Sequence, residues 1–158
     1  MSAPKEKKVV DLTGLNVACK DCSLHQLCLP TGISKDDMDR IDEIIRRRRP
    51  IARGETLFRA GDSFHSIYAV RSGSIKTYTP NRDGLEQVTG FHLPGEMVGL
   101  DAISDGAHPC TAKALETASL CEIPFDELEI LSHGIPSLQR QLLKIMSREI
   151  LHDHNLLM

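Results

Sequence analysis

Residues 66–79 read SIYAVRSGSIKTYT, and this stretch decides the fold. Two runs rich in β-branched and aromatic residues alternate with polar residues on either side of Ser72-Gly73, a pair typical of tight turns. Glycine adopts the positive φ that such turns often need at no steric cost. The stretch therefore predicts two strands joined as a β-hairpin.

The same alternating pattern of apolar and polar residues extends over residues 51–123. Short alternating runs (ETLFRAGD, EQVTGFHL, GEMVGL and ASLCEI) lie between turn signals, and Asp83-Gly84 marks a second hairpin turn. Many short, evenly spaced strands predict a jelly roll or barrel. The glycines that mark this spacing follow one another every 7 to 12 residues: Gly54, Gly61, Gly73, Gly84 and Gly95.

A short helix is expected before the strands. Ser34 is a good N-cap, and four arginines, residues 46–49, are expected to crowd the C-terminal end before Pro50 ends the helix. We interpret these arginines as a solvated helix end that complements the helix dipole, in preference to a nucleic-acid surface. The apolar stripe of this helix consists of Met38, Ile41, Ile44 and Ile45.

Helices resume after the strands. Residues 125–132 predict one short helix, and residues 135–158 predict a long one that is still helical in pattern where the chain stops, as expected for part of a longer protein. Leu138, Leu142 and Ile145 lie on one face, where they can pack on the barrel. A neighbouring face has the heptad spacing of a coiled-coil dimer seam. Its members are Leu143, Met146, Ile150, Asp153 and Leu157.

Asp153 is the unusual member of this seam. A plain core face is the alternative interpretation, but a charged residue inside an apolar seam costs stability. In a symmetric dimer Asp153 would face its own copy, and like charges repel. We therefore hypothesise that Asp153 keeps the dimer weak.

Composition limits the class of protein. The chain has 158 residues, a net charge of −3, 41% hydrophobic and 26% charged residues, which suits one globular domain. We find no membrane-length apolar run and no secretory signal, and we expect a cytoplasmic protein. Residues 1–17 predict a flexible polar arm. Cys and His residues are scattered without a nucleophile–base pattern, so an enzyme is not expected.

Residues 18–31 form a cysteine-rich loop. Cys19, Cys22 and Cys28 have the spacing C-x2-C-x5-C, and clustered cysteines in a reducing compartment indicate metal binding. A thiolate-only site needs a fourth ligand, either Cys110 or Cys121, and the residues alone do not choose between them. Zinc and iron–sulfur both remain open, although one triplet plus a distant cysteine fits a cubane cluster better.

Longer motifs carry a resemblance to a known family. CKDCSLHQLCLP, TGFHLPGEMVGLDAI, ALETASLCEIPF and LQRQLLKIMSREI resemble Fnr-type regulators of the cyclic-AMP receptor protein superfamily, from Cys19 to Met158. The resemblance implies an α+β architecture: a cyclic-nucleotide-binding-like jelly roll flanked by short helices (residues 32–134), then a dimerisation helix (residues 135–158). It also implies a homodimer and a helix-turn-helix DNA-binding domain beyond residue 158, so that DNA and RNA polymerase are partners of the full-length protein only.

The resemblance further implies the cofactor. It is a [4Fe–4S] cluster held by Cys19, Cys22, Cys28 and Cys121, with Cys110 as a bystander. In the family, oxygen converts this cluster to a [2Fe–2S] form and then to apoprotein, and the dimer dissociates. Other expected roles have plainer alternatives. Ser23 and Leu27 are expected to lie near the cluster; the alternative is that they pack as ordinary loop residues. The turn at residues 81–86 is expected to contact RNA polymerase; the alternative is that it is only the tip of a hairpin.

The superfamily's other ligand is not expected here. In a nucleotide-binding relative an acidic group binds the ribose and an arginine binds the phosphate. By alignment, Leu100 lies where that acidic residue would be, and His108-Pro109 replaces the arginine and its hydroxyl neighbour. Glu96 lies a few residues too early. The two rival functions are a zinc-stapled interaction module and a cyclic-nucleotide-binding domain.

Overall fold

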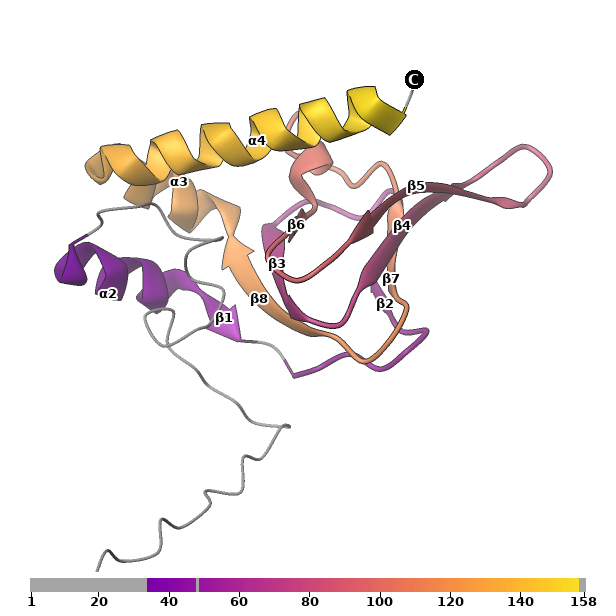
Figure 1. The fold of residues 1–158 in the computed structure, drawn as a ribbon, viewed down its shortest axis with the longest axis horizontal. Coiled ribbons are helices and arrows are strands. Elements are labelled where there is room, and N and C mark those ends of the chain that lie inside the picture. The colour runs from indigo at the N-terminus through magenta and orange to yellow at the C-terminus, as the bar shows by residue number, and fades with distance from the viewer. Residues whose placement is uncertain (1–33, 48, 157–158) are drawn as a thin grey trace, which may run out of the picture.

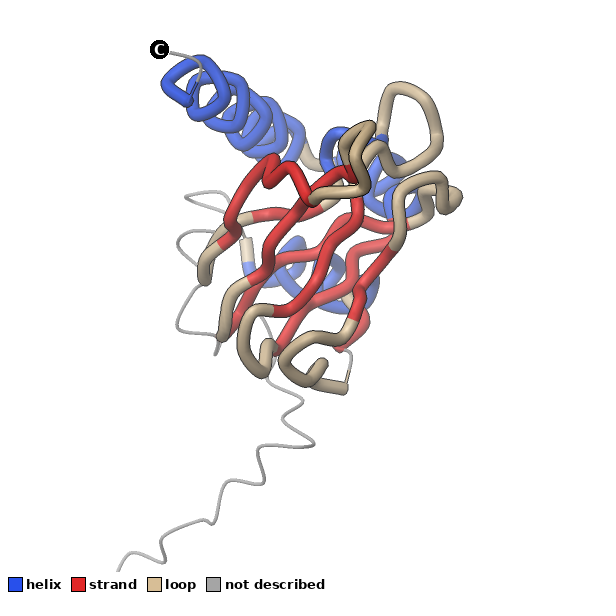
Figure 2. Tube along the Cα trace, turned by 90° about the vertical axis from the view of Figure 1, so that its right-hand side faces the viewer, coloured by secondary structure: helices blue, strands red, loops and turns tan. Residues whose placement is uncertain are grey.

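The computed structural model describes residues 34–47 and 49–156. Two antiparallel four-stranded sheets form a jelly roll, and the α-helices of the described region cover the outer face of one sheet (Figures 1 and 2). This confirms the expected α+β class. The first sheet has the order β1 (Arg46–Arg47), β8 (Ser119–Pro124), β3 (Ser66–Ser72), β6 (Met97–Val98), and the second has β2 (Thr56–Phe58), β7 (Thr111–Ala114), β4 (Ile75–Pro80), β5 (Glu86–His92).

The turn at Ser72-Gly73 corrects the sequence prediction. β3 and β4 form as expected, but they belong to different sheets, so the turn carries the chain from one sheet to the other and no hairpin forms. β3 and β4 pair with different neighbouring strands, and this long-range pairing outweighs the local turn signal at Ser72-Gly73. The second predicted hairpin is confirmed, since β4 pairs with β5 around the turn that contains Gly84.

Alternation along β3 divides the interior into two cores. Tyr68 and Val70 point between the sheets, where Phe58 and Ile75 join them. Ile67 and Ala69 point the other way, towards the helices. Successive side chains of a strand face opposite sides, so one strand serves both cores.

The helix α2 (Lys35–Ile44) begins as predicted, because the Ser34 hydroxyl accepts a hydrogen bond from the Asp37 N–H at 3.2 Å. The prediction for its arginines was wrong. Ile45 is already extended, and Arg46 and Arg47 form β1, which pairs with β8. The backbone groups at the edge of β8 form hydrogen bonds with this short strand. The helical pattern of apolar residues cannot predict such a pairing.

The remaining helices pack on the first sheet. α3 is Phe125–Gly134 and α4 is Pro136–Leu156, with a short 3-10 helix, η2 (Leu100–Ala102), before β7. Pro136 opens α4 at a position where its missing N–H costs no hydrogen bond. Leu138 and Ile145 of α4 are buried in the core shared with β3, which confirms the predicted barrel-facing side. α4 runs from α3 to the region of β5 (Figure 1).

Two glycines with the same backbone conformation differ in their surroundings. Gly73 and Gly84 have φ values of 78° and 76°. A Cβ on Gly73 would lie 2.7 Å from the Cα of Ala118, whereas a Cβ on Gly84 would meet nothing within 4 Å. Only Gly73 is therefore required for close packing as well as for its conformation.

We predict that Gly73→Ala is much more damaging than Gly84→Ala. The positive φ costs either variant about 1–2 kcal/mol, and the collision with Ala118 adds about 1–3 kcal/mol at position 73. Urea denaturation of the two variants and the wild type measures the difference. Equal losses would mean that the turn between the sheets relaxes freely.

Candidate functional site

Cys121 lies at the centre of β8, between two strands. Its Cα partner is Ala69 of β3 on one side and Arg47 of β1 on the other. The side chain is 9% exposed and belongs to the core that faces the helices, together with Ile41 of α2. The sheet therefore holds this thiol on the face covered by α2, the helix that follows the cysteine-rich loop in sequence.

Arg47, the charged neighbour of Cys121, is held in place by several contacts. The Arg47 side chain is 10% exposed and forms an ion pair with the Asp42 carboxylate in the last turn of α2. The guanidinium also donates to the Ile45 carbonyl at 3.5 Å. Arg46, in contrast, is 65% exposed and lies 3.9 Å from the Glu127 carboxylate of α3. Sequence reasoning treated all four arginines alike and missed this difference.

Several predicted site residues lie outside the described residues. They are the three loop ligands Cys19, Cys22 and Cys28, the environment residues Ser23 and Leu27, and Leu157 of the seam. Among the residues that are described, no group of three or more His, Cys, Asp or Glu side chains has the arrangement of a metal site. Cys121 is thus the one predicted ligand whose position is known.

Cys110 occupies a different place from Cys121. It precedes β7, is buried, and its thiol donates a hydrogen bond to Asp101 at 3.5 Å. Burial and the neighbouring Asp101 carboxylate raise the pKa of the Cys110 thiol to about 11. A raised pKa disfavours the thiolate form that binds metals, and the bystander role of Cys110 stays a prediction.

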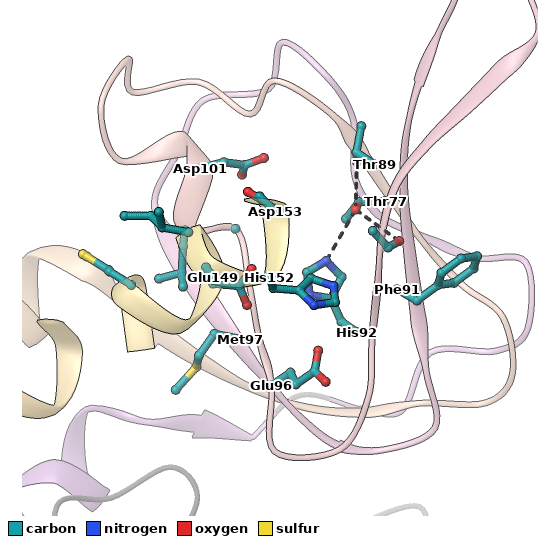
Figure 3. A pocket seen from close by; sticks show the side chains of 15 residues that line it. Thr77, Thr89, Phe91, His92, Glu96, Met97, Asp101, Glu149, His152 and Asp153 are labelled. Carbon is teal, nitrogen blue, oxygen red and sulfur yellow. Dashed lines mark hydrogen bonds between the residues drawn. The ribbon is translucent and has the colours of Figure 1, made fainter. Parts of the chain in front are cut away.

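A cavity of about 300 Å³ lies between the barrel and the second half of α4 (Figure 3). Barrel side chains enter it from β4, β5 and the segment around β6, and α4 closes it from the other side. Three members of the predicted seam line it: Met146, Ile150 and Asp153. Sequence reasoning missed most of the other polar lining residues, because they come from distant segments: Thr77, Thr89, His92, Asp101, Glu149 and His152.

Carboxylates dominate this cavity. Burial raises the pKa of Glu149, and the charges of Asp153 and Glu96 raise it further. Burial lowers the pKa of His92, which therefore carries little positive charge at neutral pH. Lys and Arg are absent from the residues that line the cavity. The described walls thus offer an anionic ligand no guanidinium or ammonium group.

The two positions compared with nucleotide-binding relatives differ in placement. Leu100 lines the cavity, as its alignment with an acidic ligand residue suggests. His108 is buried and stacks on Phe58 with ring centroids 3.7 Å apart, and burial lowers its pKa. A neutral, stacked imidazole provides packing for the barrel where a relative would present a charged guanidinium.

α4 also carries exposed apolar side chains. Leu143 is 63% exposed and Ile150 is 59% exposed, and both belong to the predicted seam. Asp153 is also exposed at the rim of the cavity. In the described region α4 is not long and apolar enough to cross a membrane, and neither is any other helix. An unpartnered apolar stripe on a surface helix is typical of an interaction face.

Sequence comparison identifies close relatives. The chain is 54% identical over 140 residues to the transcriptional activator protein Anr of Pseudomonas protegens, covering 89% of this chain and 57% of that protein. It is 49% identical over 145 residues to the fumarate and nitrate reduction regulatory protein of Escherichia coli strain K12, covering 92% of this chain and 58% of that protein. The chain thus spans a little over half the length of these curated relatives.

Solved structures share the fold. The catabolite activator protein of Thermus thermophilus matches with a TM-score of 0.67 at 22% identity, over 80% of this chain and 60% of that one. The sensor domain of the regulator DNR from Pseudomonas aeruginosa matches with a TM-score of 0.65 at 17% identity, over 84% and 85%. The cyclic nucleotide-binding domain family matches residues 48–133. Together with the Anr and fumarate and nitrate reduction relatives, this match shows that the chain belongs to the cyclic nucleotide-binding domain family, in its Crp/Fnr branch.

Proposed function

We propose that this chain is the oxygen-sensing regulatory part of an anaerobic transcription regulator, and that Cys19, Cys22, Cys28 and Cys121 hold a [4Fe–4S] cluster in it. The observation that carries the proposal is the position of Cys121. Its thiol lies on the face of β8 that α2 covers. The similarity to the Anr and fumarate and nitrate reduction regulators supports the same function.

The covalent chain allows the four cysteines to meet. Cys28 precedes Lys35 by seven residues, which extend to at most about 25 Å. The ten-residue helix α2 is about 15 Å long. β1 follows α2 directly and lies beside Cys121. The loop is therefore long enough to return along α2 and bring its cysteines to β8.

Four thiolates suit an iron–sulfur cluster chemically, since iron clusters are commonly bound by cysteine alone. When bound, the cluster would supply the reaction with oxygen. The residues of this chain would supply the structural response to the loss of the cluster. Loss of the cluster would release the cysteine loop from Cys121 and remove a support from the core that α2 shares with α4, an order–disorder switch.

The proposal includes a homodimer formed through α4. Leu143 and Ile150 present an exposed apolar stripe to a second copy, and Asp153 opposes pairing because it would approach its own copy. The full-length protein would bind DNA and RNA polymerase through the dimer and act in the cytoplasm. No cyclic nucleotide is proposed, since the cavity wall offers a phosphate no Lys or Arg.

We predict about four iron and four sulfide per chain after purification without oxygen, with a colour that bleaches in air. Cys121→Ser should lose most of the iron, whereas Cys110→Ser should keep it, because only Cys121 lies beside α2. Iron and sulfide analysis with visible spectra measures both. A colourless protein with one zinc per chain, stable in air, would contradict the oxygen-sensor function and favour a zinc-stapled module.

We predict that Asp153→Ala forms dimers in air, where the wild type should be monomeric. Removing the like charge from the seam lets the apolar stripes associate without help from the cluster. Sedimentation velocity at several concentrations measures the dissociation constant. Asp126→Ala, an exposed change on α3, is the control and should behave as the wild type. A monomeric Asp153→Ala protein in air would refute the role of Asp153.

We predict that Glu149→Gln raises the melting temperature at pH 7.5 by a few degrees. The pKa of Glu149 is raised in the folded state, so the native protein binds the proton more tightly than the unfolded chain, and stability falls as pH rises above the ordinary value near 4.5. The gain should therefore disappear below about pH 4.5. Glu129→Gln on α3 is the matched control. A gain independent of pH would show that the carboxylate charge is not the cause.

A further inference from the structure

We propose that Arg47 is a positioning residue for the cluster: its guanidinium, held by Asp42, provides the positive charge that stabilises the cluster anion next to Cys121. This inference rests on the proposed function, because it concerns the same site. It assigns a role to β1, a two-residue strand that sequence reasoning interpreted as the end of a helix.

The first argument is register. Arg47 and Cys121 are directly opposite Cα partners in the antiparallel pair of β1 and β8. Side chains of directly opposite residues lie on the same face of a sheet, with Cβ atoms about 4.5–5.5 Å apart. The pairing therefore places the arginine side chain beside the thiol, on the face that α2 covers.

The second argument is charge. A [4Fe–4S] cluster with four thiolates has a net charge of about −2. A buried anion of this kind is costly unless positive charge or hydrogen-bond donors compensate it. The reduction potentials of such clusters depend on net charge and on hydrogen bonds to the sulfurs. Arg47 is a permanent cation with five N–H donors and is only 10% exposed.

The third argument is orientation. The Asp42 carboxylate and the Ile45 carbonyl both accept hydrogen bonds from Arg47, and both belong to the end of α2 or the turn after it. These contacts hold the guanidinium between the helix and β8. Arg46 has none of these properties, since it is 65% exposed and lies near Glu127. The adjacent arginine is thus a natural control with the same charge.

The test compares Arg47→Gln with Arg46→Gln in the chain loaded with cluster under anaerobic conditions. We expect Arg47→Gln to lose the cluster in air about 10–100-fold faster than the wild type, the usual effect of removing a partner of a metal ligand. The midpoint potential of the [4Fe–4S] couple should also become more negative, because a positive charge is gone. Arg46→Gln should leave both unchanged, and Arg47→Lys should keep the potential near that of the wild type.

A potential and a cluster lifetime equal to those of Arg46→Gln would overturn the inference and leave the proposed function intact. A wild-type chain that binds no iron would instead refute the proposed function itself. If Arg47→Gln leaves Asp42 as an uncompensated charge and fails to fold, the double variant Asp42→Asn/Arg47→Gln replaces it. This neutral pair should still lose the cluster faster than the wild type, and wild-type lifetime in it would overturn the inference.

Discussion

The pairing of β8 with strands on both of its sides is the constraint on which the rest of the structure depends. Its register with β3 and β1 determines that Cys121 faces the helices and that Arg47 lies beside it. A shift by one residue would turn Leu120 towards the helices and Cys121 into the core between the sheets, because side chains alternate along a strand. The register therefore determines whether the Cys121 thiol lies on the face that α2 covers.

The cavity under α4 is lined by acidic side chains. A phosphate anion bound in such a cavity would require cationic partners. Here carboxylates line the cavity, and burial, followed by the charges of Asp153 and Glu96, raises the pKa of Glu149. His108 has become part of the barrel packing through its stack on Phe58. The proposed cluster ligand Cys121 lies outside this cavity, in the core that it shares with Ile41 of α2.

Much of the fold follows from local pattern. The spacing of glycines and alternating runs predicted the strands, and Ser34 predicted the start of α2 correctly. The errors have a common physical cause. At Gly73 and in β1, long-range pairing decided the structure: one turn crosses between sheets, and two arginines join the edge of β8. Neither arrangement produces a periodic pattern of residues in the sequence. The cavity carboxylates were missed for the same reason, since Glu96, Asp101 and Glu149 meet only after folding.

The position of Cys121 also connects the proposed cluster site to α4. Cys121, Ile41 of α2, and Leu138 and Ile145 of α4 belong to one continuous buried core. Close-packed interiors transmit small displacements because they contain few voids to absorb them. A cysteine loop bound at Cys121 would press on α2 and, through this core, on the inner face of α4. Leu143 and Ile150 are exposed on the same helix, so a shift of α4 would alter the surface offered to a second copy in the proposed dimer.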